Sequence, residues 1–265
     1  MMRTLLIRGM LVGVLAGLLS FGIARVLGEP PVDRAIAYEE QMDAGGAGAG
    51  QSDHQHGTPA AAEHDHGSEA AVSRDTQRGI GLLTATLVYG AALGGLFAIV
   101  FGFVYGRVGP WDARTTALLL AVAAFITLYF VPTLKYPANP PAVGNDGTIV
   151  YRTQLFFAMV AWSVAAMILA VMIAKLLAAT RGAWDATLIG AAVFIGMVVL
   201  AGMLMPALDE VPADFPAAVL AQFRAASLAI QATLWATLGL VFGRLAESVL
   251  QGAPQRTLPS ARASF

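Results

Sequence analysis

The stretch TTALLLAVAAFITLYFVPTL, from Thr115 to Leu134, is twenty residues long and contains no charged side chain. A helix of about 20 apolar residues is long enough to cross the ~30 Å hydrocarbon core of a bilayer. The composition of the whole chain agrees, because 57% of its 265 residues are hydrophobic and only 12% are charged. An average soluble domain has about 25% charged residues. The sequence therefore predicts an integral membrane protein.

Five further stretches have this length and character, so we predict an all-α membrane protein with six spans in a single transmembrane domain, residues 1–265. The first stretch also has the features of a cleaved signal peptide, since Arg3 and Arg8 precede an apolar run. Arg25 stands where a small-residue cleavage site is expected, and we interpret the stretch as a retained span. The predicted spans are Leu5–Leu27, Ile80–Tyr105, Thr115–Leu134, Gln154–Leu177, Ala186–Met205 and Ser227–Ala246.

The distribution of charge predicts the orientation of the chain in the membrane. With both termini in the cytoplasm, nine of the 16 basic residues lie inside, which is a weak positive-inside bias. The same orientation leaves 14 of the 17 acidic residues outside, so the inner face has a charge of +6 and the outer face −7. An acidic outer face concentrates cations at its surface.

The sequence contains an internal repeat. The stretch RVGPWDARTTALLLAVAAFITLYFVPTLKYPANPPAV, residues 107–143, resembles RGAWDATLIGAAVFIGMVVLAGMLMPALDEVPADFPAAV, residues 181–219. A fainter copy follows the first span at Glu29–Asp33. We interpret the chain as three helical hairpins with the same orientation, an arrangement known from transporters with parallel repeats. The alternative is that proline and Asp or Asn are simply common at interfacial turns.

Each copy has an outer segment of the form charged–x–Pro–small–Asp/Asn, followed by an arginine before the next span. A pseudo-threefold arrangement would gather these proline segments around one outer vestibule, where their oxygen atoms suit divalent cations. Lys135 departs from the acidic pattern; it either neutralises an acid or anchors a helix end by snorkelling. The predicted oxygen ligands are Glu29, Asp33, Asn139, Asp209, Glu210 and Asp214, and the following arginines are Arg78, Arg152 and Arg224.

All four histidines fall in one outer loop between the first two spans, residues 40–72. The loop is rich in Gly and Ala and has no apolar periodicity, so we predict that it is disordered. Paired histidines on a flexible tether are typical of metal capture, with zinc, copper, nickel or cobalt as the ion. The alternative is a polar linker whose histidines are incidental. The residues are His54, His56, His64 and His66.

Other patterns carry less information. Gly9, Gly13 and Gly17 recur on one face of the first span and predict close helix packing. Polar side chains of the last span either line a path or bond between helices; they are Gln231, Thr233 and Thr237. Because the chain has no cysteine and every histidine lies in the loop, nucleophilic triads in the bundle are excluded. We predict that the protein is not an enzyme, holds no permanent cofactor and binds no nucleic acid.

Several segments of the chain resemble the CbtA family of predicted cobalt transporter subunits. This resemblance implies a bacterial inner-membrane protein that accompanies a small single-span, histidine-bearing subunit, CbtB. It also implies that the histidine loop is a variable insert of the family. The segments are GEPPVDRAIAYE (28–39), SRDTQRGIGLLT (73–84), LKYPANPPAVG (134–144), LDEVPADFP (208–216) and FRAASLAIQATLWATLGLVFG (223–243).

Two hypotheses for function follow. In the first, the chain imports divalent cobalt, with nickel and zinc as alternative ions, alone or as an assembly of several copies. The loop histidines would capture the ion, the acids of the proline segments would strip its water, and Lys135, Tyr136 and Asn139 would shape the mouth. In the second, the chain is a membrane-tethered metal sensor or scaffold that passes ions to a partner without translocating them.

Overall fold

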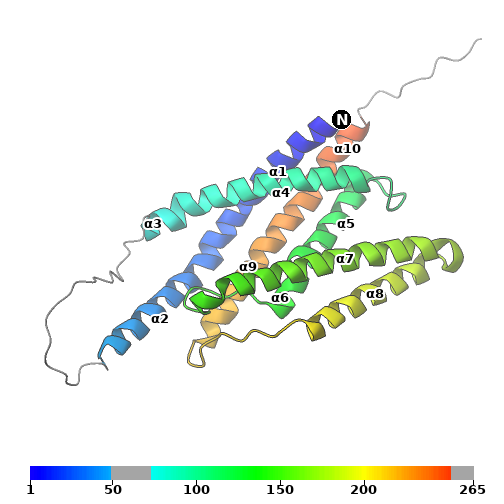
Figure 1. Ribbon diagram of the computed structural model, residues 1–265. Helices are drawn as coiled ribbons and strands as arrows, with labels where there is room; N and C mark the ends of the chain where they lie inside the picture. The colour runs from blue at the N-terminus through cyan, green and yellow to red at the C-terminus, as the bar shows by residue number, and fades with distance from the viewer. Residues whose placement is uncertain (49–72, 252–265) are drawn as a thin grey trace, which may run out of the picture.

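The computed structural model describes residues 1–48 and 73–251. Within these ranges, six helical segments are long and apolar enough to cross a membrane, which confirms the prediction of six spans (Figure 1). The spans are built from α1 (Met2–Ile23) with α2 (Glu29–Gly48), α3 (Arg74–Thr76) with α4 (Leu82–Val104), α5 (Ala113–Phe125) with α6 (Val131–Lys135), α7 (Ile149–Arg181), α8 (Ala183–Leu204), and α9 (Ala217–Thr237) with α10 (Gly243–Gln251).

The first two spans pack together through glycine. Gly9 and Gly13 of α1 are buried against Gly90 and Gly94 of α4. A Cβ atom added at Gly13 would overlap the Gly90 carbonyl oxygen, and one added at Gly94 would overlap that of Gly9. The two backbones are therefore in direct contact, as the four-residue glycine spacing predicts.

Four of the six spans contain a π-helical turn, which the sequence analysis did not predict. Two of these turns stand directly before prolines: η1 (Ala24–Gly28) precedes Pro30, and η3 (Ile126–Phe130) precedes Pro132. A proline has no N–H to donate, and an interrupted hydrogen-bond ladder accommodates it within a helix. The other two turns are η2 (Gln77–Gly81) and η5 (Leu238–Phe242).

A core of aromatic rings joins the first hairpin to the last span. The ring of Phe242 contacts those of Phe97 and Phe101 edge-on, with centroid distances of 5.4 and 5.2 Å. The spans α5 and α9–α10 pack beside this core. The helices α7 and α8 form a separate hairpin, side by side in Figure 1, in which the Trp162 indole N–H donates to the Met197 carbonyl at 2.8 Å.

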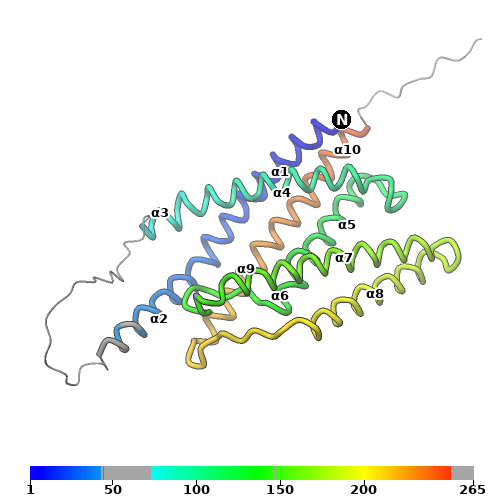
Figure 2. The backbone as a smooth tube through the Cα atoms, in the orientation of Figure 1, coloured from blue at the N-terminus to red at the C-terminus, as the bar shows by residue number. Residues whose placement is uncertain are grey.

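The connections between the spans lie at two ends of the bundle (Figure 2). One end holds the two short turns, residues 105–112 and Gly182. The opposite end, called the site end below, holds α2, the connection from Tyr136 through η4 (Asp146–Thr148), and the segment 205–216. The three predicted proline segments thus lie at the same end.

The first proline segment differs from its prediction. We expected a turn at Glu29–Asp33 and a disordered loop from residue 40, but the helix continues without a break through α2 to Gly48. The π-helical turn η1 accommodates the prolines, and Glu40, Gln41 and Met42 favour helix. The rest of the predicted loop, with all four histidines, lies outside the described residues.

Candidate functional site

The three proline segments meet in a small apolar cluster at the site end. Ala35 of α2, Val143 of the second segment and Phe215 of the third are buried together, and the Tyr38 ring contacts the Phe215 ring at 5.1 Å. This cluster packs α2 against the chain that follows the second and third proline segments. It also fixes the polar side chains that flank it.

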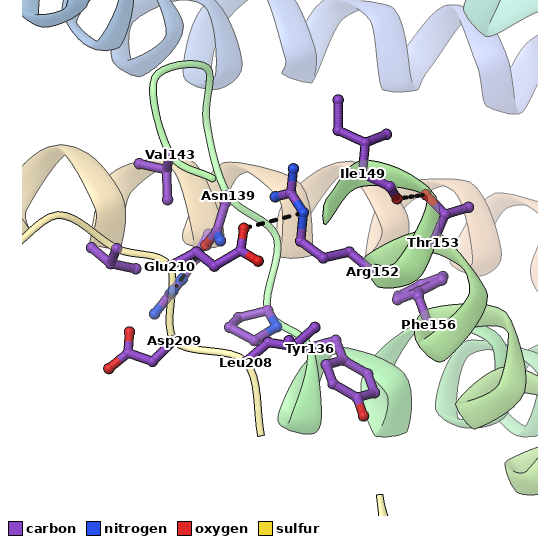
Figure 3. Close-up of a pocket in the computed structure, with 13 residues that line it drawn as sticks. Tyr136, Asn139, Val143, Ile149, Arg152, Thr153, Phe156, Leu208, Asp209 and Glu210 are labelled. Carbon is purple, nitrogen blue, oxygen red and sulfur yellow. Dashed lines mark hydrogen bonds and ion pairs between the residues drawn. The ribbon is translucent and has the colours of Figure 1, made fainter. Parts of the chain in front are cut away.

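A polar cavity of about 370 Å³ opens beside this cluster (Figure 3). It lies between the end of α6, the first turns of α7, the segment after α8 and the helix α9. Its charged and polar lining comes from the second and third proline segments and from the helices that follow them: Tyr136, Asn139, Arg152, Thr153, Asp209, Glu210 and Arg224.

An ion pair joins α7 to the third proline segment at the cavity. Arg152 Nε at the start of α7 lies 3.3 Å from Glu210 Oε2, and the Asn145 backbone N–H donates to the same oxygen at 3.0 Å. The Asn145 N–H, with the Arg152 guanidinium adding its charge, holds the pKa of the Glu210 carboxyl below its ordinary value. Glu210 is therefore a carboxylate at neutral pH.

A second contact runs in the opposite direction. Arg224 of α9 donates from Nη2 to Asn139 Oδ1 at 3.0 Å and from Nε to the Ala138 carbonyl at 3.3 Å. The arginine that follows the second proline segment thus holds the third segment, and the arginine that follows the third holds the second. This exchange couples the α5–α7 and α8–α9 connections to one another.

The acids of the first segment do not line the polar cavity. Glu29 and Asp33, one turn apart on α2, both pair with Arg74 Nη2, at 2.7 and 3.1 Å. Arg78, the arginine that the repeat pattern indicates, instead pairs with Asp75. No spacing in the sequence distinguishes Arg74 from Arg78, so sequence reasoning missed it.

The remaining predicted acids differ in position. Asp209 lines the polar cavity, and its exposed carboxylate points away from Arg152 (Figure 3). Asp214 is exposed and lies beside Tyr38, outside the lining of the cavity. Among the described residues, no group of three or more His, Asp or Glu is close enough together to hold a metal ion. Asn139, Asp209 and Glu210 are thus the predicted oxygen ligands that share the cavity.

Lys135 and Tyr136 fasten the end of α6 to the end of α8. Lys135 Nζ donates to the Gly202 carbonyl at 2.9 Å, and the Tyr136 hydroxyl donates to the Pro206 carbonyl at 2.9 Å. The lysine contact agrees with the anchoring alternative rather than with pairing to an acid. Burial raises the pKa of the Tyr136 hydroxyl, which keeps it a hydrogen-bond donor at neutral pH.

Comparison with known proteins gives one match. A family model described as probable cobalt transporter subunit (CbtA) matches residues 2–247, which include the first five spans and all but the last four residues of the sixth. Neither a curated protein nor a solved structure matches the chain. The matched range also includes the proline segments and the residues of the polar cavity. The chain therefore is a multi-pass membrane protein and belongs to the CbtA family of probable cobalt transporter subunits.

Proposed function

We propose that the chain is the membrane subunit of an importer of divalent cobalt and that the polar cavity is the entry for the ion. The observation that supports this most directly is the pairing of oxygen ligands with arginine at the site end: Glu210 with Arg152, and Asn139 with Arg224. Carboxylate and amide oxygens are ligands for divalent cations. The Glu210–Arg152 pair has no net charge, and an incoming cation would compete with the guanidinium for the carboxylate.

In this mechanism the Arg152 guanidinium pairs with the Glu210 carboxylate until a cation displaces it. A divalent ion attracts the Glu210 carboxylate more strongly than a single guanidinium does, because it has twice the charge and is more compact. The ion pair is partly exposed, with side-chain accessibilities of 28% for Arg152 and 17% for Glu210, and such pairs are weak enough to be displaced. Asp209 and Asn139 line the same cavity, and their side-chain oxygens would join Glu210 as ligands of the ion.

The site end faces outward in this proposal, with both termini in the cytoplasm of a bacterial cell and the chain in its inner membrane. The histidine loop, inserted between α2 and α3, would collect ions near the entry. Glu29, Asp33 and Asp214 would add negative charge around the mouth without belonging to the cavity. Inward movement of a cation is favoured by about 2.3 kcal/mol per charge for each 100 mV of membrane potential.

The family description names a subunit, so we propose a partner: a small single-span protein that carries histidine. The test is cobalt-57 uptake by cells that express the chain alone, with that partner, and as Glu210→Ala. Uptake above the vector control that falls with Glu210→Ala supports the importer. Faster entry of nickel or zinc than of cobalt would change the assignment of the transported ion but not the proposed mechanism.

The alternative is a membrane-tethered metal sensor or scaffold. It predicts that the purified protein binds cobalt while cells show no uptake above the vector control with or without the partner. Removal of residues 49–72 separates the roles of the loop. In the importer, the deletion lowers uptake at scarce cobalt and not at saturating cobalt; loss at saturating cobalt would place the selective site in the loop.

A further inference from the structure

A second cavity, of about 540 Å³, lies among α4, η3 with α6, α7 and α9, and Tyr89 and Phe157 in its wall are exposed on the outside of the bundle. It adjoins the polar cavity, because Tyr136, Pro137 and Phe156 line both. We call it the aromatic cavity, since Tyr89, Trp235 and other rings form much of its wall. The two cavities follow one another from the site end into the membrane-spanning part of the bundle.

Neutral polar groups line the aromatic cavity at two places. The Tyr129 hydroxyl and Ser227 Oγ are 3.0 Å apart, and the Tyr89 hydroxyl interacts with the Gln231 side chain. None of the residues that line this cavity, in the part of the chain that the structure describes, is Asp, Glu, His, Lys or Arg. The cavity is thus polar enough to hold water but has no charged ligand for an ion.

The polar residues of the last span do not all play the same part. Thr233 and Thr237 donate to carbonyls of their own helix, those of Ala229 and Thr233, at 2.8 and 2.7 Å. Gln231, in contrast, lines the aromatic cavity. Gln231 thus brings an amide to the cavity wall at membrane depth, where a polar side chain is costly unless it meets a partner.

We infer that the aromatic cavity is the intramembrane section of the ion path and that the cation occupies it with its water shell. This inference rests on the proposed function. Without a charged side chain, the cavity offers nothing to replace the ion's water ligands, so a bare ion is strongly disfavoured there. Six waters at about 30 Å³ each need roughly 180 Å³, which the cavity volume of about 540 Å³ exceeds. Hydroxyl and amide groups can bond to the outside of that shell.

The two cavities then have different tasks. The polar cavity, with Glu210, selects a divalent cation by charge, and the aromatic cavity lets the hydrated ion pass. Tyr136, Pro137 and Phe156 form the partition between them. The Tyr136 hydroxyl holds the Pro206 carbonyl, so the third proline segment is tied to this partition.

The chain has no cysteine, so single cysteines can report on the cavity without background. Gln231→Cys places a thiol in the aromatic cavity, and Leu228→Cys, one turn earlier on α9 at a position 43% exposed on the outside of the bundle, is the matched control. The probe is a positively charged methanethiosulfonate reagent, which reacts with thiols in contact with water. We expect Gln231→Cys to react at least tenfold faster than Leu228→Cys, and the reaction to reduce cobalt-57 uptake at least tenfold.

The outcomes separate this inference from the proposed function. A Gln231→Cys thiol that reacts no faster than the control shows a dry or lipid-filled cavity and overturns the inference. A thiol that reacts without loss of uptake shows a wet cavity off the path and also overturns it. In both cases uptake that depends on Glu210 leaves the proposed function standing. Absence of uptake by the unmodified protein with its partner overturns the proposed function and, with it, the inference.

Discussion

Arg152 of α7 pairs with Glu210 of the segment after α8, while Arg224 of α9 binds Asn139 of the segment after α6. The arginine after the second proline segment therefore holds the third segment, and the arginine after the third holds the second. These crossed contacts link the second and third proline segments at the site end. They also hold a carboxylate and an amide oxygen in the lining of the polar cavity.

Gly144 lies against the Arg152 guanidinium, where there is no room for a side chain. Its φ of +123° is strained for any residue with a side chain, and a Cβ there would overlap the Arg152 guanidinium. We expect Gly144→Ala to destabilise the protein by about 1–3 kcal/mol. Gly147→Ala, in the same connection, is the control, since Gly147 is not among the glycines with a positive φ and its Cβ would lie 3.3 Å from the side-chain oxygen of Asn145. Thermal unfolding in detergent measures both, and equal losses would contradict the role assigned to Gly144.

Gly13 tests the contact between the first two spans. Because a Cβ at this position overlaps the Gly90 carbonyl oxygen, Gly13→Ala forces α1 and α4 apart. Overpacking of this kind costs about 1–3 kcal/mol. Gly22→Ala on the same helix meets nothing within 4 Å and is expected to be neutral. Unfolding curves of the two variants decide the matter; a neutral Gly13→Ala would mean that the helices are not in backbone contact.

Substitution of Lys135 tests whether this side chain anchors α6 to α8 or compensates the charge of an acid. Its ammonium donates to the Gly202 carbonyl, so Lys135→Met removes a charged hydrogen bond worth about 1.5–3 kcal/mol at most. We expect lower thermal stability and an apparent affinity for cobalt within about twofold of the wild type, since a difference of that size is near 0.4 kcal/mol. A change in apparent affinity beyond tenfold with unchanged stability would show that Lys135 instead compensates an acid.

The lowered pKa of the Glu210 carboxyl predicts how the thermal stability of the protein depends on pH. Its pKa in the folded protein lies below the ordinary 4.5, so the interactions of the carboxylate stabilise the fold above pH 4.5 and are lost as the pH falls through the lower folded-state pKa. The difference in Tm between the wild type and Glu210→Gln should therefore be constant between about pH 7 and 5.5 and shrink only below about 4.5. A difference that already fades near pH 6 would indicate that another group controls the pair.

Hydropathy predicts the spans because it depends on local composition, and the stretch Thr115–Leu134 alone is enough to place one helix. The repeat pattern predicts that the oxygen ligands of all three proline segments surround one vestibule, whereas those that line the polar cavity come only from the second and third segments. It cannot predict which partners pair, since Arg74 and Glu29 are separated in the sequence by the histidine loop and are brought together by the packing of α4 along α1. The π-helical turns were missed for a similar reason, because they leave no mark on hydropathy.

Cobalt-57 uptake by Glu210→Gln, compared with Glu247→Gln, tests the central claim most directly. Both acids pair with an arginine at a span boundary, but Glu247 pairs with Arg114 at the end of the bundle opposite the polar cavity. With the partner present, we predict that Glu210→Gln lowers uptake at least tenfold at low cobalt, whereas Glu247→Gln stays within about twofold of the wild type at equal amounts of folded protein. Equal uptake by the two variants would contradict the assignment of the polar cavity as the entry for the ion.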